Sequence, residues 1–111
     1  MRAAVKTDKA PKPAGPYSQA IRAGDFIFVA GQGGVDPATG KFVEGGIEEQ
    51  TKQTLKNIEA ILKAAGSSLD DVVKVSVFLK DVRDFHAMNK VFAEFFKEPP
   101  PARTTVGVEF V

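Results

Sequence analysis

Residues 47–65 contain the pattern that most constrains the fold, because apolar or small side chains recur at every third or fourth position. These positions are Ile47, Thr51, Leu55, Ile58, Leu62 and Ala65. The spacing places them on one face of a helix, and Gly66 is a favourable residue for ending it. A helix with a single apolar face must cover another layer, which the rest of the chain has to supply.

Two alternating segments later in the chain predict strands. Residues 72–80 alternate apolar and polar side chains, with Val73, Val75, Val77 and Leu79 expected on the core face. Residues 104–111 alternate in the same way. Between them we predict a second helix, capped by Asp81 or Asp84 and ending near Lys97. Its apolar positions are Phe85, Met88, Phe92 and Phe95 or Phe96.

The N-terminal third predicts a hairpin. Residues 10–16 hold three prolines and a glycine, which predicts a restrained loop. Residues 18–22 and 26–30 read as strands around a turn at Gly24-Asp25, and the apolar run 26–30 is expected to be buried on both faces. Residues 31–40 predict a loop, and residues 41–43 a brief strand at most.

The order of elements is therefore β-β-α-β-α-β. This order predicts an α+β fold, a mixed sheet with two helices on one face, formed as a single domain over residues 1–111.

Composition excludes several classes of function. The formal net charge is +1 and the basic residues are scattered, so we expect no nucleic-acid and no membrane partner. The chain has no cysteine and one histidine, which excludes disulfides, thiolate sites and multi-histidine metal sites. Without a long apolar stretch, a cytoplasmic location is expected.

Arg103 is the candidate ligand-binding residue. A proline run, Pro99–Pro101, delivers it to the start of the last predicted strand. A guanidinium group at a strand end is suited to bidentate binding of a carboxylate, although an ordinary surface arginine is the alternative.

Other candidates are weaker by themselves. Tyr17, the only tyrosine, is more often a packed aromatic. His86 has the pattern of a surface histidine. Gly31-Gln32-Gly33-Gly34 lacks the Gly-Lys-Ser/Thr ending of a phosphate loop, so a turn is favoured.

Taken together, ordered segments of the chain resemble the RidA (YjgF/YER057c/UK114) family of reactive intermediate deaminases. They include Gly15-Pro-Tyr17, Phe28-Val-Ala-Gly-Gln32, Asp36-Pro-Ala-Thr-Gly40, Val77-Phe-Leu-Lys-Asp81 and Pro101-Ala-Arg-Thr-Thr-Val106. The resemblance covers nearly the whole chain.

The resemblance implies a chorismate-mutase-like fold and a homotrimer with clefts between subunits. It implies hydrolysis of enamines and imines such as 2-aminoacrylate to 2-oxo acids and ammonia, with no cofactor and no metal. Arg103 is then expected to pair with the substrate carboxylate, with Tyr17, Gln32 and Asn89 as further binding residues. The backbones of Gly31 and Thr105 are expected to contact the imine nitrogen and position water.

Three departures from the family pattern affect these expectations. Ala30 stands where many active members carry serine, and Gly33-Gly34 is expected to make that rim more flexible. The family continues into a last strand with a glutamate that positions water; residues for that strand are absent from this sequence, and Glu109 lies one strand too early.

Two other functions stay open from the sequence. One is a non-catalytic trimer that binds 2-oxo or amino carboxylates. The other is a chorismate-mutase-like enzyme, suggested by fold alone.

Overall fold

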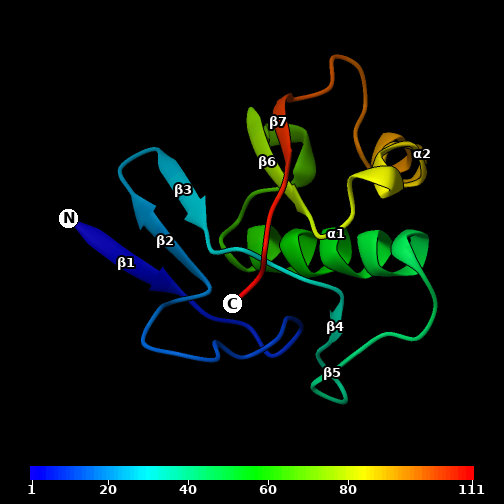
Figure 1. Cartoon of the computed structure of the whole chain (residues 1–111). Helices are drawn as coiled ribbons and strands as arrows, with labels where there is room; N and C mark the ends of the chain where they lie inside the picture. The colour runs from blue at the N-terminus through cyan, green and yellow to red at the C-terminus, as the bar shows by residue number, and fades with distance from the viewer.

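The computed structural model describes all 111 residues and confirms a mixed α+β fold (Figure 1). The seven strands are β1 (Arg2–Val5), β2 (Ala20–Ala23), β3 (Phe26–Val29), β4 (Val35–Asp36), β5 (Lys41–Phe42), β6 (Lys74–Leu79) and β7 (Ala102–Gly107). The helices are α1 (Ile47–Ala64) and α2 (Phe85–Phe95), with short 3-10 turns η1 (Leu69–Asp71) and η2 (Val82–Asp84).

The predicted hairpin is confirmed as β2 and β3, which pair antiparallel around Gly24. Gly24 has a φ of 60°, a left-handed conformation that favours glycine. Strand β1 pairs antiparallel with the other edge of β2, so this sheet has the order β1-β2-β3. Strand β1 was not predicted, because its four residues, Arg-Ala-Ala-Val, show no clear alternation of apolar and polar side chains.

Strands β6 and β7 form a parallel pair connected through α2. Val75, Val77 and Leu79 point inward on β6, as predicted, whereas Val73, which was also predicted on the core face, precedes the strand and is 78% exposed. Strand β7 begins at Ala102 and ends at Gly107, so it starts earlier and ends sooner than the predicted 104–111. A β-carbon at Gly107 would lie 2.4 Å from a side-chain carbon of Val82, so a larger residue at the end of β7 would require the Val82 side chain to move.

Hydrogen bonding divides the strands into three groups, β1-β2-β3, β4-β5 and β6-β7, rather than the single mixed sheet that we expected. Strands β3 and β6 each keep an unpaired edge. In Figure 1, β1–β3 lie to the left of α1, and β6 and β7 lie above α1.

Helix α1 matches its prediction closely. The Glu49 side chain accepts a hydrogen bond from the backbone N–H of Gly46 at the helix start, and Gly66 adopts a φ of 81° just beyond the end. Helix α2 ends at Phe95, two residues before the predicted Lys97. The Asp81 side chain caps η2, whereas Asp84 precedes α2 without making a side-chain cap.

Two apolar clusters form the core, and α1 contributes side chains to both. Ile61 packs with Val5, Ala10 and Ala20, and Leu55 packs with Leu79, Met88 and Phe92.

The prediction that residues 26–30 are buried on both faces was wrong, because Phe26 and Phe28 are 67% and 63% exposed. The β1-β2-β3 sheet has a helix on one face only, so its other face is open. Neither α1 nor α2 combines the length and the hydropathy that a membrane-spanning helix needs.

Candidate functional site

Arg103 lies at the start of β7, half-buried beside α2. Its NH2 group donates a hydrogen bond of 2.6 Å to Oδ1 of Asn89, and its NH1 group lies 3.9 Å from the sulfur of Met88. The centre of the guanidinium lies 4.8 Å from the centroid of the Phe92 ring and 5.6 Å from that of Phe85. The structure thus brings together two predicted site residues, Arg103 and Asn89.

The local fold explains this placement. Pro99–Pro101 separates α2 from β7, and the backbone N–H of Ala102 donates to the carbonyl of Val73 at 3.0 Å. This bond starts the parallel ladder in which Arg103 lies opposite Val75. All four side chains that Arg103 contacts come from α2 and lie at i, i+3, i+4 and i+7, which is one face of a helix.

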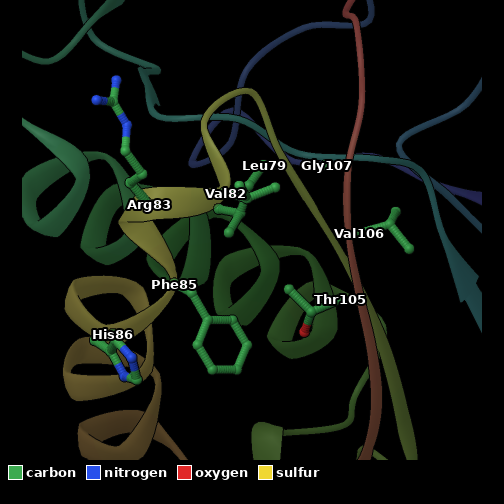
Figure 2. A pocket seen from close by; sticks show the side chains of 8 residues that line it. All are labelled: Leu79, Val82, Arg83, Phe85, His86, Thr105, Val106 and Gly107. Carbon is green, nitrogen blue, oxygen red and sulfur yellow. The ribbon is translucent and has the colours of Figure 1, made fainter.

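Thr105 lies two residues after Arg103 and therefore on the same face of β7. It lines an open pocket of about 440 Å³. The other lining residues are Leu79, Val82, Arg83, Phe85, His86, Val106 and Gly107. Figure 2 shows Thr105 and Phe85 pointing into the same space, with Val106 on the opposite side of β7 and Arg83 pointing away. The Phe85 ring both lines this pocket and lies beside the Arg103 guanidinium, so the pocket and Arg103 are adjacent.

His86 is exposed, as predicted for a surface histidine, but it also lies at the rim of this pocket. Its ring meets that of Phe85 edge-on, with centroids 5.4 Å apart.

The other predicted site residues lie on loops of the β1–β3 half. Tyr17 is 52% exposed, and its hydroxyl accepts a hydrogen bond from the backbone N–H of Ala14. Gly31 and Gln32 follow β3, and the Gln32 amide donates to the carbonyl of Ala30 at 3.4 Å. None of these three residues hydrogen-bonds to Arg103, Asn89 or Thr105 within the chain.

Buried Gln19, which the sequence analysis did not single out, holds the loop before Tyr17 in place. Its side-chain oxygen accepts from the backbone N–H of Thr7, and its amide donates to the carbonyls of Thr7, Ala10 and Pro11. These bonds satisfy backbone groups that the proline-rich loop cannot pair by itself.

Buried Asn57 has the same role for the glycine loop after β3. Its amide donates to the carbonyls of Gly33 and Val35 at 3.2 and 2.8 Å, and its oxygen accepts from Gln53. Gly34 is buried, and a β-carbon there would lie 2.9 Å from the Cα of Gln50. The rim expected to be more flexible is therefore held by Asn57 and packed against α1.

Asp81 and Arg83 form a charged pair at the surface next to the pocket. Nε and NH2 of Arg83 both donate to the carboxylate, as does the Arg83 backbone N–H. These hydrogen bonds lower the pKa of Asp81 from 3.8 to about 2. No group of three or more histidine, aspartate or glutamate side chains is arranged to hold a metal ion.

This pair predicts a pH-dependent contribution to stability. The folded pKa of Asp81 is below the unfolded value, so the contribution is complete above about pH 5 and is lost as the pH falls from about 4 to about 2. Asp81→Asn should lower Tm by a small amount at pH 7, and its difference from wild type should shrink between pH 4 and 2. Thermal unfolding over a pH series checks this, with Asp25→Asn as the control. A difference that stays constant down to pH 2 would contradict it.

The fold and site define a small α+β protein with a fixed arginine at the start of a strand. The endoribonuclease L-PSP family model matches residues 7–111, and the chain belongs to this family, also called the YjgF/RidA family. A RutC family protein of Pyrococcus horikoshii is 58% identical over 108 residues, which cover 97% of this chain and 86% of the relative. A 2-iminobutanoate/2-iminopropanoate deaminase of Dermatophagoides farinae is 43% identical over 94% of this chain and 81% of the relative.

Solved structures agree with the family assignment. The crystal structure of RidA from an Antarctic Psychrobacter matches with a TM-score of 0.92 and 46% identity, over 96% of this chain and 85% of that one. The crystal structure of Escherichia coli TdcF with bound serine matches with a TM-score of 0.90 and 37% identity, over 96% of this chain and 85% of that one.

Proposed function

We propose that this protein hydrolyses reactive enamines and imines of the 2-aminoacrylate type to 2-oxo acids and ammonia. The observation that carries the proposal is the fixed guanidinium of Arg103. Arginine has five N–H donors, and the contacts with Asn89 and Met88 leave donors for a carboxylate. A relative named as an imine deaminase supports the same chemistry, and a similar structure with bound serine supports binding of a small amino carboxylate.

The proposed hydrolysis requires only a modest rate acceleration from the protein. The enamine tautomerises to an imine, water adds to the imine carbon, and the resulting carbinolamine loses ammonia to leave the 2-oxo acid. Imines hydrolyse readily in water, so positioning supplies a large share of the required acceleration. Arg103 binds the carboxylate, while the backbone of Thr105, two residues further along β7, contacts the imine nitrogen and positions water.

We further propose that the active form is a homotrimer whose clefts lie between subunits. Within one chain, Tyr17, Gly31 and Gln32 make no hydrogen bond with Arg103, so a neighbouring subunit supplies them to its cleft. Phe26, Phe28, Phe78 and Val106 are apolar side chains exposed on strands, which favours burial against further copies. Light scattering after gel filtration should give three times the chain mass of 11.9 kDa; a monomer would contradict the assembly.

The activity is tested by generating 2-aminoacrylate with a serine dehydratase in the presence of semicarbazide. Active protein should increase the rate of 2-oxo acid release and reduce semicarbazone formed directly from the imine. No difference from a reaction without the protein would reject the proposed hydrolysis.

A second candidate is a non-catalytic binding protein for small 2-oxo or amino carboxylates. The favouring observation is that no aspartate or glutamate forms a hydrogen bond or ion pair with Arg103, and none lines the pocket at Thr105. Calorimetry that detects 2-oxobutanoate binding, with no turnover of 2-aminoacrylate, would favour this candidate.

A further inference from the structure

Arg103 lies beside two aromatic rings and also hydrogen-bonds to Asn89. Both the Phe85 and Phe92 centroids lie within the distance of about 6 Å at which an aromatic face attracts a cation. The edge of the guanidinium is held separately by Oδ1 of Asn89. The two neighbouring rings and the hydrogen-bond acceptor together restrict both the position and the rotation of the guanidinium.

We propose that Phe85 is a positioning residue, whose ring holds the Arg103 guanidinium in the orientation that receives a carboxylate. An arginine side chain that is free in water loses considerable rotamer entropy when a ligand fixes it. If the rings and Asn89 fix it before the ligand arrives, less of that loss accompanies binding, so affinity rises. For its ligand this inference rests on the proposed function, but the state of Arg103 in the free protein does not depend on it.

Phe85 tests this role better than Phe92 does. Phe92 is only 7% exposed and belongs to the core cluster around Leu55, so its replacement disturbs packing. Phe85 is 37% exposed and lies at the first position of α2, where a change of side chain leaves the core intact. Leucine there keeps an apolar side chain and removes the aromatic face, whereas tyrosine keeps the face.

The first measurement uses the ligand-free protein. In ¹H–¹⁵N NMR spectra, the Nε–H signal of Arg103, assigned by its disappearance in Arg103→Lys, should be displaced by the ring currents of its neighbours. Phe85→Leu should shift this signal toward the position of a free arginine, whereas Phe85→Tyr should leave it displaced. Phe110→Leu replaces an exposed phenylalanine beyond the end of β7 and serves as the control.

The second measurement is calorimetric binding of 2-oxobutanoate to the same variants, with Tm recorded for each. Phe85→Leu should weaken binding by about fivefold, with tyrosine restoring most of the affinity and Tm changing little. In turnover, the leucine variant should raise KM more than it lowers kcat.

Three results would overturn the proposal: an unmoved Arg103 signal in Phe85→Leu, binding within twofold of wild type, or a tyrosine variant as weak as leucine. If wild type binds no 2-oxobutanoate and turns over no 2-aminoacrylate, the proposed function fails. The NMR comparison then decides the positioning role alone.

Discussion

Replacing Arg103 with alanine is expected to lower kcat/KM for 2-aminoacrylate by about 30- to 1,000-fold. This range corresponds to about 2–4 kcal/mol, the effect of losing a charge-assisted, two-point contact with a carboxylate. The semicarbazone competition assay measures it. The loss should fall mainly on KM, because the carboxylate is bound in the substrate as well as in the transition state.

A lysine variant separates charge from geometry at the same position. Arg103→Lys keeps the positive charge but loses the planar guanidinium that lies beside the two rings, so an intermediate loss of activity is expected. Arg2→Ala, on β1, controls for the removal of an exposed arginine elsewhere. Full activity in Arg103→Ala would refute the assigned role.

Replacing Asn57 with alanine should lower the free energy of unfolding by about 2–4 kcal/mol. The change leaves the carbonyls of Gly33 and Val35 without the amide that they accept from, in a region where Asn57 itself is fully buried. Urea unfolding at a fixed chain concentration measures the effect, because assembly would make stability concentration-dependent.

Two variants serve as controls for this prediction. Asn57→Asp keeps the shape but removes the donor, so it should be at least as destabilising as alanine. Gln53→Ala removes only the partner of the Asn57 oxygen, at a half-buried position, and should cost about 1 kcal/mol or less. Equal stability of Asn57→Asp and wild type would show that these hydrogen bonds do not hold the loop.

The elements with long, regular patterns were predictable from the sequence. The three- and four-residue spacing around Leu55 predicted α1 almost to the residue, and alternation predicted β6 with its inward valines. Strand β1 was missed because four residues of low contrast acquire their structure by pairing with β2. Burial of Phe26 and Phe28 was predicted wrongly, since an apolar run does not reveal whether both faces of its sheet are covered.

The candidate site was predictable in part. The position of Arg103 after a proline run, together with the family resemblance, indicated that Arg103 and Asn89 belong together, and they form a hydrogen bond of 2.6 Å. The roles of Gln19 and Asn57 depend on which backbone groups meet their amides, and these contacts span 8 to 24 residues of sequence. The one available signal was the polar side chain of Asn57 between the apolar positions Leu55 and Ile58 of a helix.

The central claim is that Arg103 receives the carboxylate of a small 2-oxo or imino acid. A crystal structure of the protein with 2-oxobutanoate tests this claim most directly. We expect both carboxylate oxygens about 2.7–2.9 Å from guanidinium nitrogens of Arg103, with the bond to Asn89 retained. A carboxylate bound elsewhere, with Arg103 contacting only α2, would contradict the account.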